Sequence, residues 1–190
     1  MNPDTITIVS GLPRSGTSMM MKMLQAGGMA VLTDKIRTAD EDNPKGYYEF
    51  ERVKKLPHDQ AWLEDAGGKA VKVISALLDK LPAHYTYKVI FMRRKMPEIL
   101  ASQKQMLIRR EEPTDRISDQ KMSEAFQKHL QVIQGWLEKQ PNIEVLYVDY
   151  HQVLQAPTRL AAKVNQFLGG TLDTEAMAGA VDRTLYRQRQ

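Results

Sequence analysis

The sequence predicts an α/β domain in which helices flank a central, mostly parallel β-sheet. Strand-like and helical segments alternate along the chain, and the first strand ends in a glycine-containing turn that leads into a helix. With 190 residues, 42% of them apolar and 26% charged, the chain is long enough for one domain with a substantial core. We therefore expect residues 1–190 to form a single domain.

The first expected strand covers residues 5–10, which are β-branched almost throughout and lead to Gly11. Such a run is typical of an interior strand of a parallel sheet. We expect further strands at 70–74, 88–92 and 144–148, and helices at 17–26, 97–110, 119–140 and 158–168. The methionines of the first helix are expected in the core. Residues 39–46, rich in Asp, Asn, Pro and Gly, predict a surface loop.

Composition excludes several kinds of chemistry. The chain has no cysteine, so it forms no disulfide and holds no metal through thiolates. No spacing of histidines and carboxylates predicts a metal site. The net charge of +4 favours anionic ligands, but it is too small to indicate a nucleic-acid partner. We see neither a signal peptide nor a run of about 18 apolar residues, so we expect no membrane span and a cytoplasmic location.

The turn after the first strand has the spacing of a phosphate-binding loop. Four residues separate Gly11 from Gly16, and Thr17 and Ser18 follow. In this setting backbone N–H groups and the helix dipole can hold an anion, as in phosphate-loop NTPases. Thr17 stands where those proteins have lysine, which argues against a triphosphate, and Arg14 could supply the positive charge instead. The alternative is a loop whose glycines only turn the chain and whose arginine is solvated.

Three ordered motifs give this chain a resemblance to a known family. Residues 12–18, Leu-Pro-Arg-Ser-Gly-Thr-Ser, resemble the 5′-phosphosulfate loop of sulfotransferases. Residues 89–94 end in arginine, and Ser102 follows Arg94 by eight positions, as in that family's 3′-phosphate segment. Residues 145–150, with Leu154, Pro157 and the Phe-Leu-Gly of 167–169, are similar to its third segment. The chain thus resembles sulfotransferases that use 3′-phosphoadenosine 5′-phosphosulfate (PAPS).

The resemblance implies PAPS as the cofactor, without a metal. The residues that would bind it are Pro13, Arg14, Ser15, Gly16, Thr17, Ser18, Arg94, Ser102 and Tyr150. Physical reasoning agrees, because a cofactor with a 5′-phosphosulfate and a 3′-phosphate needs two anion sites, and a strand-end arginine with a nearby hydroxyl makes the second. Either Arg93 or Arg94 could face the phosphate, and the eight-residue spacing selects Arg94.

Two further features of the family have only loose counterparts. Its tail also reaches the 3′-phosphate, which makes Arg183, Arg187 and Arg189 candidates by charge and position, although a solvated tail is the alternative. Met19 stands where the family often has an aromatic residue beside the adenine. Adenine recognition by stacking is therefore not expected to be specific.

The resemblance also implies the reaction, sulfuryl transfer to a hydroxyl or amine acceptor. Arg14 would stabilise the leaving group, and Lys72 would lie near the sulfuryl group. The family's usual catalytic histidine is absent, since residues 73–75 are Val-Ile-Ser. Glu49 resembles the glutamate that some bacterial members use as the base, with a helix-start glutamate as the alternative. His58 is the second choice of base, and the other histidines are expected at the surface.

The acceptor is expected to be a small molecule or a side chain, in a pocket built from residues 33–51 and 104–123. Two other functions stay open. A phosphate-loop kinase or nucleotidase would use Mg·ATP, with Asp149 binding Mg²⁺ at a strand end. A non-catalytic relative would bind a nucleotide without turnover. The oligomeric state is left open.

Overall fold

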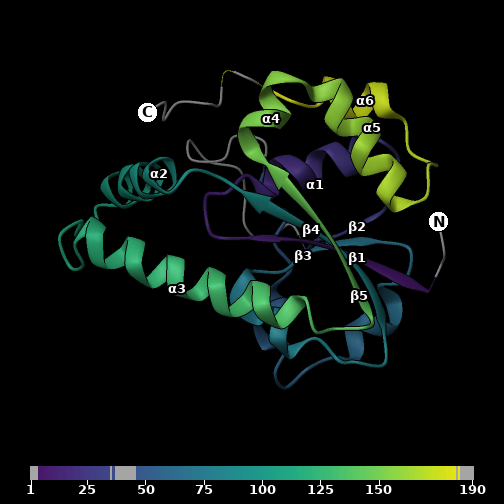
Figure 1. Cartoon of the computed structure of the whole chain (residues 1–190), viewed down its shortest axis with the longest axis horizontal. Helices are drawn as coiled ribbons and strands as arrows, with labels where there is room; N and C mark the ends of the chain where they lie inside the picture. The colour runs from purple at the N-terminus through teal and green to yellow at the C-terminus, as the bar shows by residue number, and fades with distance from the viewer. Residues whose placement is uncertain (1–3, 35, 37–45, 183, 185–190) are drawn as a thin grey trace.

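The computed structural model describes residues 4–34, 36, 46–182 and 184, and its centre is a five-stranded parallel sheet (Figure 1). The strand order is β2-β3-β1-β4-β5. The strands are β1 (Thr5–Gly11), β2 (Val31–Leu32), β3 (Ala70–Lys72), β4 (Thr86–Arg93) and β5 (Ile143–Asp149). Every pairing is parallel, so the predicted α/β class is confirmed and the sheet is entirely rather than mostly parallel.

The central strand is β1, and all seven of its residues are buried. It pairs with β3 on one side and with β4 on the other, where Gly11 lies opposite Met92. Its side chains alternate between the two faces, so Ile6 and Ile8 join one apolar cluster and Val9 joins the other. Burial on both faces explains why this strand reads as one β-branched run.

Helices cover both faces of the sheet (Figure 1). One face packs against α1 (Thr17–Ala26), α4 (Tyr150–Gln155), α5 (Pro157–Leu168) and α6 (Thr174–Gly179). The other packs against the end of α3 (Asp119–Leu137) and the 3₁₀ segments η1 (Glu51–Lys55), η2 (Ala61–Asp65) and η3 (Ser75–Lys80). Met20, Met21 and Met23 have no exposed surface, as expected of core residues.

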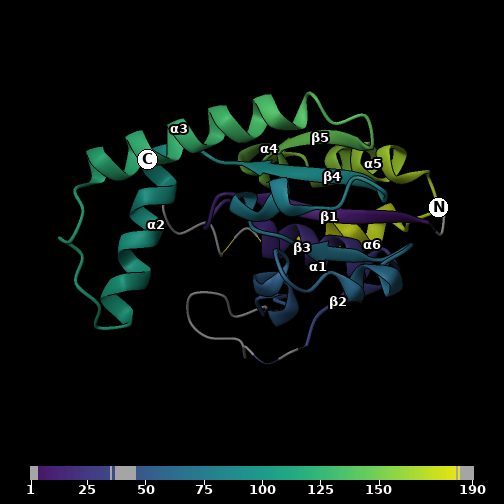
Figure 2. The ribbon, with the colours of Figure 1, turned by 90° about the horizontal axis from the view of Figure 1, so that it is seen from below.

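Helix α2 (Met96–Arg109) follows β4 and, with the start of α3, extends beyond the edge of the sheet (Figure 2). Its buried residues are Glu98, Ile99 and Ser102. Glu98 and Ser102 are four positions apart and therefore lie on one face of the helix. Since the carboxyl ends of parallel strands share one edge of a sheet, the turn after β1 and the start of α2 lie side by side.

The expected elements agree with the structure within a few residues, and the short ones were missed. The strand expected at 70–74 pairs only to Lys72, because Val73 makes one last hydrogen bond to Val9 and the chain then turns into η3. The helix expected at 119–140 ends at Leu137. The sequence analysis missed β2, α4, α6 and the 3₁₀ segments. Most of the loop expected at 39–46 lies outside the described residues.

Two kinds of structure are absent from residues 4–34, 36, 46–182 and 184. No helix there is long and apolar enough to cross a membrane. No group of three or more His, Cys, Asp or Glu side chains is arranged there to hold a metal ion.

The packing of β1 makes a stability prediction. Replacing Ile8, which has no exposed surface, by Ala should lower the free energy of unfolding by about 2–5 kcal/mol, because a cavity forms in the core. The matched control is Val132→Ala on α3, where the side chain is 65% exposed and the change should stay within about 0.5 kcal/mol. Urea unfolding of both variants measures the difference, and equal losses would contradict the assigned core.

Candidate active site

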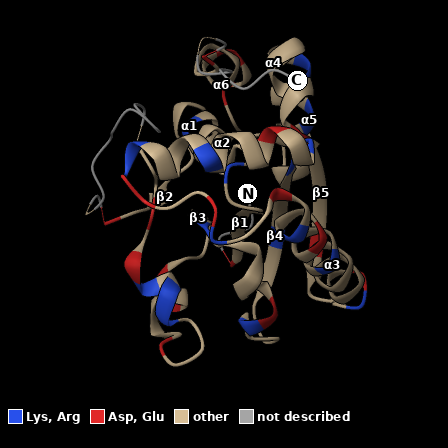
Figure 3. Cartoon of the chain, turned by 90° about the vertical axis from the view of Figure 1, so that its left-hand side faces the viewer, with Lys and Arg blue, Asp and Glu red and all other residues tan. Residues whose placement is uncertain are grey.

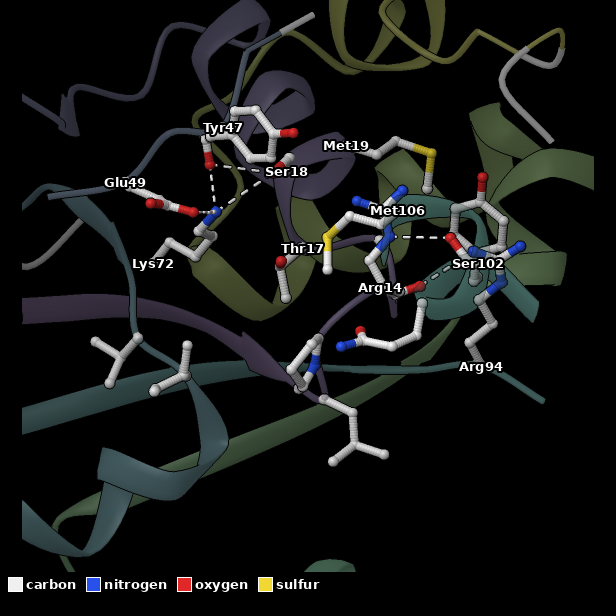
Figure 4. A pocket seen from close by; sticks show the side chains of 18 of the residues that line it. Arg14, Thr17, Ser18, Met19, Tyr47, Glu49, Lys72, Arg94, Ser102 and Met106 are labelled. Carbon is white, nitrogen blue, oxygen red and sulfur yellow. Dashed lines mark hydrogen bonds and ion pairs between the residues drawn. The ribbon is translucent and has the colours of Figure 1, made fainter. Parts of the chain in front are cut away.

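A pocket of about 480 Å³ lies at the carboxyl edge of the sheet, against the turn after β1 (Figure 4). The residues expected to bind PAPS, except Ser15, line it, and so do Glu49 and Lys72. Figure 4 shows Arg14, Arg94 and Ser102 on one side, Lys72, Glu49 and Tyr47 on the other, and Thr17 between them. Segments far apart in the sequence therefore meet at one cavity.

The turn after β1, residues 11–16, forms a concave backbone cradle. Gly11, Arg14 and Gly16 all have positive φ angles, of 145°, 68° and 99°. Gly16 precedes α1 and offers no side-chain cap to the first-turn N–H groups, which have no acceptor within the helix. These N–H groups and the positive end of the helix dipole favour an anion at this position.

Ser15 does not line the pocket, because its side chain is fully buried beneath the turn. Among the described residues its hydroxyl has no hydrogen-bond partner. A Cβ atom built on Gly11 would come within 2.6 Å of that hydroxyl. A buried hydroxyl without a partner, below a backbone cradle, fits a turn that closes on an anionic group.

Arg94 and Ser102 form the second cationic and polar group of the pocket. Arg94 Nε donates to Glu98 Oε2 at 2.9 Å, and its Nη1 donates to the carbonyl oxygen of Arg14 at 3.0 Å. Ser102 Oγ accepts a hydrogen bond from Arg14 Nε at 2.9 Å. Arg93 instead binds the Asp149 carboxylate through two hydrogen bonds of 3.0 and 3.1 Å, away from the pocket lining. Of the two candidate arginines, the structure thus brings Arg94 to the site.

Glu98 is a site residue that the sequence analysis missed. Its side chain is 1% exposed and pairs with Arg94, whose side chain is 8% exposed. A buried carboxylate is costly unless it is paired, so Glu98 and Arg94 fix one another. The available signal was the i, i+4 spacing of an arginine and a glutamate at the start of a helix.

Tyr150, the first residue of α4, packs between the turn after β1 and the Arg94 side chain. A Cβ atom on Gly16 would lie 2.4 Å from its ring, and the Arg94 guanidinium lies 4.5 Å above the ring centre. Burial raises the pKa of the Tyr150 hydroxyl above its usual value, against the smaller opposing effect of Arg94. The phenol therefore stays neutral at physiological pH.

On the opposite side of the pocket, Lys72 leaves the end of β3. Its Nζ donates to the carbonyl oxygen of Tyr47 and lies 3.4 Å from Ser18 Oγ and 3.8 Å from Glu49 Oε1. Ser18 Oγ donates to the same Tyr47 carbonyl at 3.1 Å. A cation from the neighbouring strand thus contacts the first turn of α1, close to the position where the loop lysine is missing.

Glu49 lies at the pocket and not at a helix start. The first turn of η1 carries Glu51, whereas Glu49 precedes the N-cap residue Phe50. Thr33 Oγ1 donates to the Glu49 carbonyl at 2.9 Å, and Asp34 accepts from the Glu51 backbone, so this segment is held on both sides. His58, the second-choice base, is exposed and does not line the pocket.

His129 differs from the expected surface histidine. It is partly buried, and its Nε2 lies 2.9 Å from the buried hydroxyl of Ser75, although neither residue lines the pocket. Among the other predicted positions, Met19 lines the pocket. Arg183, Arg187 and Arg189 lie outside the described residues.

A family model described as the sulfotransferase domain matches residues 4–189. The chain belongs to the sulfotransferase family. The resemblance inferred from the three motifs is confirmed, and membership supports a transferase enzyme that carries out PAPS-dependent sulfuryl transfer. The kinase or nucleotidase alternative is not favoured.

Solved sulfotransferase structures share the fold at low sequence identity. The sulfotransferase domain of the Synechococcus PCC 7002 olefin synthase has a TM-score of 0.58 and 13% identity, over 98% of this chain and 80% of that one. The sulfotransferase domain from the curacin biosynthetic pathway has a TM-score of 0.54 and 15% identity, over 96% of this chain and 84% of that one. The sulfotransferase from Alicyclobacillus acidocaldarius has a TM-score of 0.51 and 14% identity, over 97% of this chain and 88% of that one. No curated protein sequence matches the chain.

The geometry also disfavours the magnesium role of Asp149 that a kinase would need. Both carboxylate oxygens accept hydrogen bonds from Arg93, and Asp149 is not among the residues that line the pocket. Figure 3 views this sulfotransferase from the carboxyl ends of the strands, where acidic and basic residues are mixed over the elements. Among the described residues that line the pocket, seven are Lys or Arg and two are Asp or Glu, so positive charge predominates in the pocket.

One wall of the pocket is apolar, although Gln103, Gln105, Arg109 and Arg110 also line the cavity. Its side chains come from η1, from the turn after β3, from η3 and from α2, namely Phe50, Val53, Val73, Ile74, Leu77 and Met106. Ile74 is 49% exposed, which is high for a large apolar side chain. Of the expected acceptor segments, residues 47, 49 and 50 line the pocket and so do 105, 106, 109 and 110, but 111–123 do not. Residues 53, 54, 73, 74 and 77 also line the pocket but were not predicted to do so, because they come from separate segments that only the folded chain brings together.

The close contact at Gly16 makes the second prediction. Gly16→Ala should lower the free energy of unfolding by about 1–3 kcal/mol more than Gly28→Ala, because the new Cβ collides with the Tyr150 ring. Gly28 is the matched control, since its φ of +92° carries a similar backbone cost but a Cβ there has nothing within 4 Å. Urea unfolding compares the two variants. Equal losses of unfolding free energy would contradict the prediction, because they would mean that the Tyr150 ring moves aside at no cost.

Proposed function

We propose that the described pocket binds PAPS and a small acceptor, and that the chain transfers the sulfuryl group to a hydroxyl or amine of that acceptor. One observation carries the proposal: two anion-binding groups, the turn of residues 11–16 and the Arg94–Ser102 pair, face one cavity. A ligand with a 5′-phosphosulfate and a 3′-phosphate matches that arrangement. Bound PAPS would supply the activated sulfuryl group.

The residues on the turn have the properties needed for the 5′ end of the cofactor. The N–H groups at residues 16–18 and the Arg14 guanidinium can stabilise the negative charge that builds on the leaving oxygen. Lys72 stands beside Ser18 on the other side of the turn, where its charge can stabilise the transferring group. Their fixed positions support catalysis by orientation, because sulfuryl transfer, like phosphoryl transfer, requires the partners in line.

Glu49 is the proposed general base. Its carboxylate lines the pocket within 3.8 Å of Lys72 Nζ, so a base and a cation share the boundary between the cradle and the apolar wall. An acceptor hydroxyl placed there could give its proton to Glu49 as the new S–O bond forms. No histidine among the described residues lines the pocket.

The apolar wall supports an acceptor with an apolar body. Phe50, Ile74, Leu77 and Met106 can bury an aryl or alkyl group of the acceptor. We therefore favour a small apolar alcohol, phenol or amine over a side chain of a folded protein.

The third prediction tests the cofactor and separates the competing functions. Adenosine 3′,5′-bisphosphate should bind with a Kd of about 1 μM to 1 mM, measured by calorimetry, and Mg²⁺ should not change it. ATP should bind more weakly with or without Mg²⁺, since the turn lacks the lysine that pairs with a triphosphate. A preference for Mg·ATP would overturn the proposal. Binding of the bisphosphate without turnover on any acceptor would favour the non-catalytic relative.

The fourth prediction tests the base. Glu49→Gln should lower kcat about 10²–10⁴-fold with an aliphatic alcohol or unsubstituted phenol as acceptor, while binding of adenosine 3′,5′-bisphosphate stays unchanged. The loss should shrink with nitrophenols, which ionise readily and need less help from a base. Glu64→Gln is the matched control, because Glu64 is exposed and does not line the pocket. An equal loss with every acceptor would remove Glu49 from proton transfer.

A further inference from the structure

Arg14 is held at two points by the group that is proposed to bind the 3′-phosphate. Its side chain donates from Nε to Ser102 Oγ at 2.9 Å, and its backbone carbonyl accepts from Arg94 Nη1 at 3.0 Å. The first contact joins residues 88 positions apart in the sequence, and the second joins residues 80 apart. The two regions are therefore joined by hydrogen bonds as well as by a shared cavity (Figure 4).

The backbone of Arg14 needs such support. Its φ of 68° is in the left-handed region, which a side chain with a Cβ disfavours, and such conformations persist when neighbouring groups hold them. The hydrogen bond from Arg94 fastens the carbonyl of this residue. Arg94 is itself fixed by the buried Glu98 carboxylate and by the Tyr150 ring. A rigid group thus sets the conformation of a strained one.

Ser102 can link the two regions because a hydroxyl accepts and donates at once. Its oxygen already accepts from Arg14, which leaves its single proton as the group that a phosphate oxygen would accept. A phosphate that accepts a hydrogen bond from this O–H makes the serine oxygen more negative, and this strengthens the hydrogen bond that the oxygen accepts from Arg14. An anion beside Arg94 and Ser102 should therefore hold Arg14 more firmly in position.

We propose that the two anion sites are positively coupled through Arg14, so that the 3′-phosphate of the nucleotide helps to order the cradle for the 5′ end. This inference rests on the proposed function, because it assumes that one nucleotide spans both sites. Ser102 and Arg94 then act as positioning residues for Arg14 as well as ligands. The enzyme would recognise the 3′-phosphate cooperatively, and adenosine 5′-phosphosulfate, which lacks that phosphate, would meet a less ordered Arg14.

Calorimetry with adenosine and three of its phosphates tests the coupling without turnover. The ligands are adenosine, adenosine 3′-phosphate, adenosine 5′-phosphate and adenosine 3′,5′-bisphosphate. The affinity gained from the 3′-phosphate should be at least about fivefold larger when the 5′-phosphate is present than when it is absent. We define the coupling ratio as the affinity gained from the 3′-phosphate in the presence of the 5′-phosphate, divided by the gain in its absence. In Ser102→Ala this ratio should fall toward one, because the hydrogen bond that links the 3′ site to Arg14 is lost.

Two variants serve as checks on Ser102→Ala. Arg14→Lys keeps the charge but lacks the Nε donor, so it should also lose the coupling. Arg93→Ala is the control, because Arg93 pairs with Asp149 outside the pocket lining and the ratio should be unchanged. A comparison between wild type and Ser102→Ala cancels any interaction between the two phosphates within the ligand itself.

Each outcome decides between the proposals. If the 3′-phosphate raises the affinity of the wild type equally with and without the 5′-phosphate, the coupling is overturned and the proposed function stays intact. A ratio above fivefold that survives in both Ser102→Ala and Arg14→Lys would also overturn it, since the coupling would then follow another route. Failure of adenosine 3′,5′-bisphosphate to bind at all would overturn the proposed function and the coupling together.

Discussion

The parallel pairing of β1 with β4 is the constraint on which the site depends. Because Gly11 lies opposite Met92, the two strands end together, and the chain leaving each one enters the same space. The turn of residues 11–16 and Arg94 are therefore neighbours before any side chain is considered. Parallel strands present their carboxyl ends at one edge, which is where such folds place their ligands.

Positive charge reaches the cradle from neighbouring strands, not from the loop position where lysine is usual. Thr17 replaces that lysine, but Lys72 approaches from β3 on one side and Arg94 from β4 on the other. Arg14 supplies the third cation from within the turn. Spreading the charge over three segments suits a ligand whose anionic groups are far apart better than it suits a compact triphosphate chain.

The sequence allowed prediction of features that depend on local spacing. The glycines of the turn, the arginine at the end of β4 and the serine eight positions later are recognisable because each motif lies within one strand–turn–helix unit. The long elements were predicted for the same reason, since their apolar periodicity is local. The site residues predicted from these motifs line the pocket, except for the buried Ser15.

Features that depend on contacts between distant segments were not predictable. The role of Glu98 requires knowing that the first turn of α2 packs on the cradle, and the contact of His129 with Ser75 requires the position of α3 over η3. The apolar wall draws on four segments whose order in the sequence says nothing of their proximity. A single sequence contains these side chains but not the register that brings them together.

Helix α2 contributes to both halves of the pocket from different turns. Its first turns carry Glu98 and Ser102 beside the cradle, and its later turns carry Met106, Arg109 and Arg110. Substitutions in the later turns are therefore expected to alter the apolar side of the pocket and to leave the contacts of Glu98 and Ser102 with Arg94 and Arg14 in place. This separation along one helix would let the shape of the apolar wall change without disturbing the hydrogen bonds that hold Arg14 and Arg94.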